Sequence, residues 1–367
     1  MRRDNRGISR IVEFVIMFTV FIVIVTAFYS LANIWLRPPI VDYAQEEAIR
    51  ISEVLIGNPG YLKNGSADWE KCNATMLNNN LTTIGFAVDN NSYGVLSMKK
   101  IIAMRNLTYK KARQVMALDY LNFNITFRYF NGSIMLSNKT DNKTALTFGA
   151  NFGDNATVSW KRIVNVVDLS GNYENAILTV YLSKKGKFDE RVVINEIMYH
   201  PPMVQPRNEW VELYNVANMA VDVDKWTIED LVEWERDTLM DCGNGTIISS
   251  RSYAIIVANY NSVKENFTET LTIGESPKAI WLLAVGSYAA IGRGLNDTGD
   301  TITVRNSYYD VVDKVTYDNS LGASGDNNTL ERKNPYSPSD FNSDNWGASN
   351  TDPPTIGGTP GRKNSIP

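Results

Sequence analysis

The sequence predicts a three-part fold: an N-terminal transmembrane helix, an α+β head with an antiparallel sheet, and an all-β sandwich. The 23 residues 14–36 carry no charge, and as a helix they reach about 35 Å, enough to cross a hydrocarbon core of about 30 Å. Two short helical segments and then alternating strands follow in the middle of the chain. After residue 190, short strands separated by turn residues indicate a sandwich.

These patterns divide the chain into five segments. Residues 1–10 form a basic cytoplasmic leader, 11–37 the transmembrane helix, 38–186 an extracellular α+β domain, 191–347 the β-sandwich, and 348–367 a flexible tail rich in Pro and Gly. In the α+β domain, apolar residues recur with helical spacing over 40–56, and Ser97 and Thr108 are candidate N-caps of two further helices. The stretch "LNFNITFRYF" at 121–130 alternates as a half-buried strand does.

The charge distribution predicts a single-pass membrane protein with a cytoplasmic N-terminus. Five arginines against Asp4 and Glu13 give the first 37 residues a net charge of +3, and the remaining 330 carry −7. Basic residues stay on the cytoplasmic side of a membrane segment, so the bulk of the chain is expected outside the cell. The acidic balance argues against a nucleic-acid partner, which needs a basic patch.

Fourteen Asn-x-Ser/Thr sequons, all beyond the apolar segment, support an exported surface that carries glycans. They are Asn64, Asn73, Asn80, Asn90, Asn106, Asn124, Asn131, Asn138, Asn142, Asn155, Asn244, Asn266, Asn296 and Asn327. Cys72 and Cys242 would face an oxidising compartment, but the sequence leaves open whether they are bridged.

The C-terminal part contains, in this order, "VVINEIMYHPP", "NEWVELYNVANMAVDVDKWTIED", "GDTITVRNSYYDVVDKVTY", "LERKNP", "NWGASN" and "TPGRKN". Through these motifs, residues 191–363 resemble a lamin-tail domain of the prokaryotic secreted type. It implies an immunoglobulin-like β-sandwich that serves attachment or recognition without catalysis. The acidic stretch "LVEWERDTLMDCGNG" is longer than the family pattern has it.

In the N-terminal part, Arg6 and Gly7 precede a long apolar segment, and "NPG", "DWE", "IGFA" and "LSMKKIIAMRNLTYKKARQVMALDYLNFNITF" follow it in order. In these features the chain is similar to archaeal pilin-like proteins with a short basic leader. That resemblance implies processing between Gly7 and Ile8, which would leave Glu13 as the sixth residue of the mature chain. In such assemblies a carboxylate near that position pairs with an amine inside an apolar bundle and sets the register between subunits. The alternative is that Glu13 lies at the membrane interface and pairs with Arg10, and both interpretations stay open.

No motif indicates catalysis, so we expect a protein that is not an enzyme. The single histidine, His200, follows a strand and precedes two prolines, and no nucleophile motif accompanies it. Glu196, Glu209 and Glu212 could in principle form a glycosidase pair, but they belong to the lamin-tail pattern, which favours structural hydrogen bonding.

We expect no cofactor and no zinc, because no Cys/His cluster has ligand spacing. Calcium is the one metal that loop residues suggest, through Asp297 and Asp300 in "LNDTGDT" and Asp326 in "SGDNNT", although Asp, Asn and Gly are also ordinary turn residues. Trp210 and Trp226 are expected in the core, whereas Trp69 and Trp234 lie in predicted loops and are better candidates for contact with a partner.

The function that these observations predict is a non-catalytic, membrane-anchored, pilin-like surface protein that presents its sandwich for adhesion, attachment or assembly of a surface structure. The expected partners are membrane lipid, other pilin-like subunits, and an extracellular protein or carbohydrate, and no nucleic acid. One alternative is a monomeric anchored binding module that forms no filament. A second is an extracellular hydrolase that uses the sandwich carboxylates.

Overall fold

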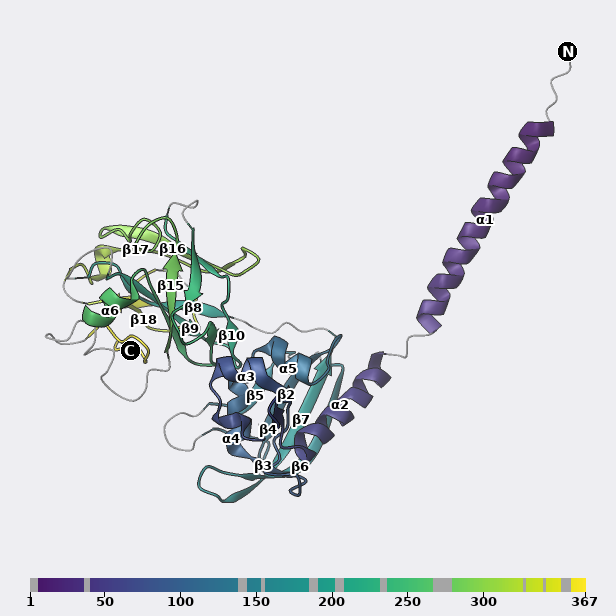
Figure 1. Ribbon diagram of the computed structural model, residues 1–367, viewed down its shortest axis with the longest axis horizontal. Helices are drawn as coiled ribbons and strands as arrows, with labels where there is room; N and C mark the ends of the chain where they lie inside the picture. The colour runs from purple at the N-terminus through teal and green to yellow at the C-terminus, as the bar shows by residue number, and fades with distance from the viewer. Residues whose placement is uncertain are drawn as a thin grey trace, which may run out of the picture.

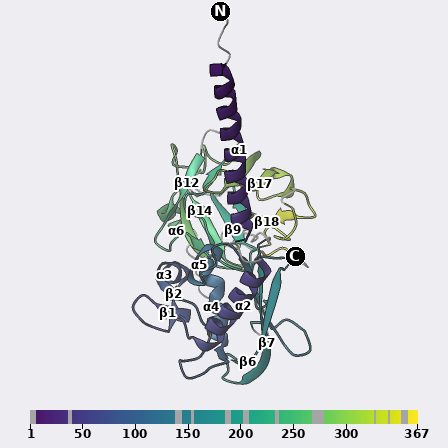
Figure 2. The same ribbon diagram turned by 90° about the vertical axis from the view of Figure 1, so that its right-hand side faces the viewer.

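The computed structural model contains a long N-terminal helix, a head built on a five-stranded sheet, and a larger β-sandwich (Figures 1 and 2). It describes residues 6–35, 40–137, 144–152, 156–184, 191–201, 208–231, 236–266, 279–325, 328–338, 341–350 and 358–367.

The first helix, α1 (Arg6–Trp35), extends away from the rest of the molecule (Figure 1). Its described side chains, residues 14–29, are all exposed. Within the described part of the chain, however, no helix has the length and hydropathy that crossing a membrane requires. The predicted fold class, which began with a transmembrane, pilin-like helix, is therefore wrong in that respect, and the molecule is built mainly of β-sheet.

The head is built on a sheet with the strand order β3-β6-β7-β4-β5. Its strands are β3 (Val95–Ser97), β4 (Asn122–Arg128), β5 (Thr147–Gly149), β6 (Val158–Val167) and β7 (Tyr173–Ser183). Helix α2 (Ile40–Gly57) packs on β6 and β7 through its apolar face. Strands β4, β5, β6 and β7 pair in the antiparallel direction, as predicted, and β3 adds a parallel pairing with β6 that was not predicted.

Short helices cover the rest of the head. They are α3 (Ala74–Asn80), α4 (Met98–Ala103) and α5 (Tyr109–Val115), beside a small ladder of β1 (Tyr61–Leu62) and β2 (Leu81–Thr83). The predicted N-caps are confirmed: the side chains of Ser97 and Thr108 accept from the backbone N–H groups of Lys100 and Lys111. Such caps satisfy donors that have no partner within the helix.

The C-terminal half is the predicted β-sandwich, and most of it is one ten-stranded sheet with the order β17-β16-β11-β12-β15-β14-β9-β8-β18-β19. The strands are β8 (Val192–Met198), β9 (Trp210–Asn215), β11 (Thr227–Glu229), β12 (Arg236–Asp241), β14 (Tyr253–Val257), β15 (Ala279–Val285), β16 (Gly299–Arg305), β17 (Val311–Asp318), β18 (Leu330–Arg332) and β19 (Trp346–Ala348). A two-stranded ladder of β10 (Val221–Asp222) and β13 (Ile247–Ile248), together with α6 (Tyr260–Asn266), completes it.

The long sheet folds over so that β17, at one end, contacts β8, near the other. Asp313 on β17 joins the two layers: its Oδ2 accepts from the backbone N–H of Ile194 at 2.8 Å and from Arg332 Nη1 at 3.1 Å. The Arg332 side chain is fully buried. A buried charge is costly unless it is paired and hydrogen bonded, so this contact fixes how the two layers meet.

The head and the sandwich are joined by backbone hydrogen bonds near Arg105. The carbonyl oxygen of Arg105, in the head, accepts from Ser250 N of the sandwich. The Arg105 side chain stays within the head, where its Nη2 donates to the carbonyl oxygens of Thr144 and Ala145. The carbonyl of Leu107 accepts from Ala220 N at 3.1 Å. Burial lowers the pKa of Arg105 to about 10. One continuous apolar core runs through both parts.

The tryptophans divide differently from the prediction. Trp210 and Trp226 are buried, as expected for core residues. Trp69 is also fully buried, and its Nε1 donates to the carbonyl of Pro59 at 2.9 Å, so it is no surface contact. The buried ammonium of Lys100 donates to the same carbonyl at 2.7 Å. Trp234 lies outside the described residues.

The loop around Pro59 leaves no room for a side chain at Gly85. A Cβ there would lie 1.9 Å from the carbonyl oxygen of Asn58. We expect Gly85→Ala to lower the free energy of unfolding by about 1–3 kcal/mol, the range for forcing atoms into a packed interior. Gly347→Ala is the control, because its Cβ would meet only ordinary contacts from 3.4 Å outward. Denaturant unfolding of both variants measures the difference, and equal stabilities would contradict the prediction.

Candidate functional site

Three buried glutamates lie side by side in the sandwich. Glu196 on β8 is paired in register with Glu212 on β9 and with Glu331 on β18, and all three are fully buried. Residues directly opposite each other on neighbouring strands project from the same face of the sheet. The topology therefore brings three acidic groups together that lie far apart in the sequence.

These carboxylates hold the C-terminal segment, residues 358–366. Glu196 Oε1 accepts from Thr359 N at 2.7 Å, and Glu212 Oε2 accepts from Gly361 N at 2.5 Å. Glu331 Oε2 accepts from the backbone N–H groups of Ser365 and Ile366 at 2.8 and 3.0 Å. This part of the predicted flexible tail is thus docked on the sandwich, whereas residues 351–357 lie outside the described residues. We call the three glutamates and this segment the C-terminal clasp.

Two asparagines complete the clasp. Asn195 Nδ2 donates to Glu212 Oε1 at 2.8 Å and to Asn364 Oδ1 at 2.9 Å. Asn364 Nδ2 in turn donates to the carbonyl oxygens of Asn195 and Arg332. The buried polar groups therefore form one connected network, in which each member restrains the next.

The clasp holds protons at neutral pH. Burial, followed by the charge of Glu331, raises the pKa of Glu196 to about 8. Burial, followed by the charge of Glu196, raises the pKa of Glu212 well above its ordinary value. The Thr359 hydroxyl lies 3.2 Å from Glu196 Oε2 and 2.8 Å from Glu331 Oε1. A hydroxyl has one hydrogen to donate, so a protonated carboxyl satisfies the second contact.

This geometry does not suit glycoside hydrolysis. A glycosidase needs two carboxyl groups that flank a substrate bond. The carboxyl groups of Glu196 and Glu212 are fully buried and accept from the protein's own backbone N–H groups. Glu209, the third candidate, lies elsewhere: its Oε2 accepts from Leu295 N at 3.0 Å, and burial raises its pKa to about 8.

Two of the three residues that suggested calcium lie near Glu209: Asp297 in the turn before β16 and Asp300 on β16. Asp300 accepts from the backbone N–H groups of Leu231, Thr301 and Asn296 through both carboxylate oxygens. Asp297 lies 3.7 Å from His200, measured between Oδ1 and Nδ1. Asp326 lies outside the described residues. Over the part of the chain that is described, no three or more His, Cys, Asp or Glu side chains are arranged to hold a metal ion.

The predicted N-terminal sites fall in a part of α1 whose side chains are not described. Gly7, Ile8 and Glu13 are all within the helix. Leader processing and subunit registry therefore stay predictions. The two cysteines are free and half-buried: Cys72 packs against the main core and Cys242 against a smaller cluster around Trp281.

The described sequon asparagines differ in their accessibility. Six are exposed: Asn64, Asn73, Asn90, Asn131, Asn244 and Asn296. Asn80, Asn106 and Asn124 are half-buried, and Asn138, Asn142, Asn155, Asn327 and the side chain of Asn266 lie outside the description. Exposed asparagines in loops suit glycosylation, which stays a prediction.

The hairpin between β16 and β17 presents two exposed aromatic side chains that were not among the contact residues predicted from the sequence. Tyr308 is 84% and Tyr309 61% exposed. Asn306 shapes the turn, since its Oδ1 accepts from Tyr308 N at 2.9 Å and Asp310 N at 3.0 Å. The guanidinium of Arg236 lies 5.7 Å from the centre of the Tyr309 ring. Two adjacent tyrosines between the turn residues Asn306 and Asp310, in "NSYYD", are the sequence signal that could have predicted these exposed rings.

Glu331, Thr359 and Asn364 also belong to the clasp, and the sequence did not predict a role for them. All three lie in the "LERKNP" and "TPGRKN" segments that carry the family resemblance. Their positions were therefore visible in the sequence, but their partners on β8 and β9 were not, because these contacts span more than 100 residues.

Comparison with known proteins gives a match to one family model and distant likenesses to solved structures. One structural likeness is to the crystal structure of a DUF4876 family protein from Bacteroides thetaiotaomicron VPI-5482, with 12% sequence identity and a TM-score of 0.30 over 59% of this chain and 84% of that chain. None of the curated proteins compared with this chain is a significant match. Residues 189–319 match the family model of the lamin tail domain, which confirms the lamin-tail part of the predicted resemblance, while the pilin-like part stays a prediction.

Proposed function

We propose that this chain is a non-catalytic extracellular protein whose lamin-tail sandwich attaches it to another surface. The observation that carries the proposal is that the buried carboxylates of the lamin-tail segment are occupied by hydrogen bonds within the protein. Glu196, Glu209 and Glu212 accept hydrogen bonds from the protein's own backbone. An enzyme would aim such groups at a substrate, whereas a rigid module for attachment uses them to fix its loops and its C-terminus.

The contact element that we propose is the hairpin that carries Tyr308 and Tyr309. Tyrosine supplies a large amphipathic surface at a low cost in conformational entropy and is enriched at binding surfaces. Two such rings lie exposed on a turn that is held by Asn306 and backed by Arg236. An extracellular protein or carbohydrate is the partner that we propose, and the acidic balance of the chain disfavours nucleic acid.

The extracellular location is supported by the sequons, of which the described ones include six exposed asparagines. We further propose membrane lipid as the partner of α1, because a contiguous apolar surface that is left exposed marks an interaction site. Assembly of several copies through α1 stays a prediction, and no observation favours the hydrolase alternative.

Removal of the two exposed tyrosines should weaken attachment without loss of the fold. We expect the double variant Tyr308→Ser/Tyr309→Ser of the full chain to bind cell-envelope fragments about tenfold or more weakly, since aromatic anchors each contribute on the order of 1–2 kcal/mol. Cosedimentation measures this, and protease or periodate treatment of the fragments separates a protein partner from a carbohydrate. Tyr120→Ser, a change at a 78% exposed tyrosine of the head, is the control. Equal sedimentation of the double variant and wild type would contradict the proposal.

Exposed apolar side chains of α1 should drive association with lipid. In a flotation assay with phosphatidylglycerol/phosphatidylcholine vesicles, the full chain is expected to rise with the lipid. The variant Phe14→Asp/Phe21→Asp should remain at the bottom, because each substitution places a charge on an apolar helix. Phe130→Asp, at an exposed phenylalanine of the head, should float as wild type does. Flotation of the α1 variant would remove lipid from the proposal.

The buried carboxyl groups make the stability of the sandwich depend on pH. Glu196 and Glu209 have a folded-state pKa of about 8 against an ordinary value of 4.5. The stabilisation is complete below pH 4.5 and is lost as the pH rises toward 8, because the folded state holds protons that the unfolded state releases. We expect each of the two groups to lower the free energy of unfolding by about 3–4 kcal/mol between pH 5 and pH 8.

Glu209→Gln keeps a neutral side chain of the same shape at all pH values, so its stability should fall less between pH 5 and pH 8 than that of wild type. Asp224→Asn, at an exposed position of the sandwich, should leave the pH dependence unchanged. Denaturant unfolding at both pH values gives the comparison. A wild-type stability that is flat or rises over this range would show that the carboxyl groups ionise freely in the folded protein.

A further inference from the structure

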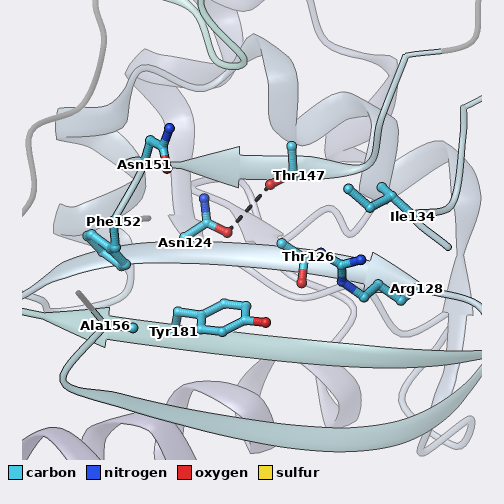
Figure 3. A pocket seen from close by; sticks show the side chains of 9 residues that line it. All are labelled: Asn124, Thr126, Arg128, Ile134, Thr147, Asn151, Phe152, Ala156 and Tyr181. Atoms are coloured by element: carbon cyan, nitrogen blue, oxygen red, sulfur yellow. Dashed lines mark hydrogen bonds between the residues drawn. The ribbon is translucent and has the colours of Figure 1, made fainter. Parts of the chain in front are cut away.

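An open pocket lies on the face of the head sheet that strands β4, β5 and β7 share (Figure 3). It has a volume of about 440 Å³, within the range of small-molecule sites. Asn124, Thr126 and Arg128 follow one another at every second position of β4, so they project from the same face. Figure 3 shows Thr147 and Asn151 on one side of them and Tyr181 on the other.

The strand register holds these side chains next to one another. Asn124 is paired with Tyr181 of β7, and Thr126 with Thr147 of β5. Hydrogen bonds also fix the side chain of Asn124: its Nδ2 donates to the carbonyl of Ala150 at 2.8 Å, and its Oδ1 lies 3.4 Å from Thr147 Oγ1. The pocket is thus built on regular strands, which position side chains more firmly than loops do.

One polar group in the pocket has no partner. Thr126 is 94% buried, being 6% exposed, and its Oγ1 makes no hydrogen bond with the described residues. A buried hydroxyl without a partner costs on the order of 1–3 kcal/mol. Such a group is explained when a ligand supplies the partner, and Thr126 is among the residues that line the pocket.

The lining of the pocket selects a class of ligand. Amide groups of Asn124 and Asn151 and hydroxyls of Thr126, Thr147 and Tyr181 can both donate and accept, which matches a molecule rich in hydroxyl groups. The side chains of Tyr181 and Phe152 supply aromatic rings. Arg128 is the one charged residue of the lining, and no acidic residue is among the described residues there. A carboxylate is the natural partner of a guanidinium.

We propose that this pocket binds a sugar unit that carries a carboxylate, of the hexuronic acid type. The hydroxyl groups of the sugar pair with the threonine and asparagine side chains, and the Thr126 hydroxyl gains its missing partner. The carboxylate is recognised by Arg128, one of whose N–H groups already donates to the carbonyl of Gly132 at 2.8 Å. This site lies in the head and is independent of the attachment role of the sandwich.

A ligand in this pocket is incompatible with glycosylation of the sequon at Asn124. Asn124 and Thr126 are the first and third residues of a sequon, but both line the pocket. A glycan on Asn124 would occupy the space that the ligand needs and would remove the bond to Ala150. We therefore expect Asn124 to be unmodified in the mature protein, unlike exposed asparagines such as Asn131.

Binding of methyl β-D-glucuronide and methyl β-D-glucoside to the full chain tests the proposal, with calorimetry or ligand-observed NMR as the readout. The glucuronide should bind saturably and at least about tenfold more tightly than the glucoside, which is the equivalent of one charge-assisted contact. Arg128→Gln should reduce its affinity to that of the glucoside. Lys161→Gln, at an exposed position of β6 outside the pocket lining, should bind as wild type does.

Thr126→Val separates binding from structure, because valine has the same shape and no hydroxyl. This variant should unfold at the same or a higher temperature than wild type, yet bind the glucuronide several-fold more weakly. Equal affinities for the two glycosides, unchanged binding by Arg128→Gln or Thr126→Val, or no saturation up to about 10 mM would each overturn the proposal. So would mass-spectrometric detection of a glycan on Asn124 in the full chain.

Discussion

A carboxylate that is removed from water must accept hydrogen bonds or hold a proton, and the sandwich depends on that constraint at three adjacent positions. Glu196, Glu212 and Glu331 are fully buried on neighbouring strands. The donors they require come from the backbone of residues 359–366. The C-terminal segment therefore folds onto the sheet because the sheet contains unmet acceptors, and the acceptors are tolerated because the segment satisfies them.

Strand β18, which carries Glu331, also joins the two layers of the sandwich on its other face. Successive residues of a strand point to opposite faces, so Glu331 and Arg332 on β18 serve different layers. Glu331 binds the C-terminal segment, whereas Arg332 reaches Asp313 on β17 and the carbonyl of Ile194 on β8. A strand of three residues thus joins the docked C-terminus to the contact between the ends of the sheet. Loss of either partner would leave a buried charge uncompensated, which costs more than the pair contributes.

Local rules predicted the parts of this molecule that depend on neighbouring residues in the sequence. The caps at Ser97 and Thr108 and the alternation along β4 follow from a few adjacent positions. The errors concern partners that are distant in sequence. Trp69 was predicted to lie in an exposed loop, but its Nε1 donates to the carbonyl of Pro59, to which Lys100 also donates. The Pro/Gly-rich tail was predicted to be flexible, but the three glutamates accept hydrogen bonds from its last residues. Apolar composition predicted a membrane-spanning α1, but no described helix meets that requirement.

The candidate sites divide along the same line. In the sandwich, the three glutamates that were candidates for glycosidase catalysis accept hydrogen bonds from the protein's own backbone. The sandwich therefore presents its shape and its exposed aromatic side chains to other molecules. In the head, Thr126 lines a pocket with a buried hydroxyl that no described residue satisfies. Buried atoms without a partner also occur in the sandwich, at Thr227 Oγ1 and Trp346 Nε1, so a missing partner alone does not mark a binding site. At Thr126 the missing partner coincides with a pocket whose lining is polar, and a ligand in that pocket can supply the hydrogen bond. That coincidence is the physical reason to seek specific small-molecule recognition in the head.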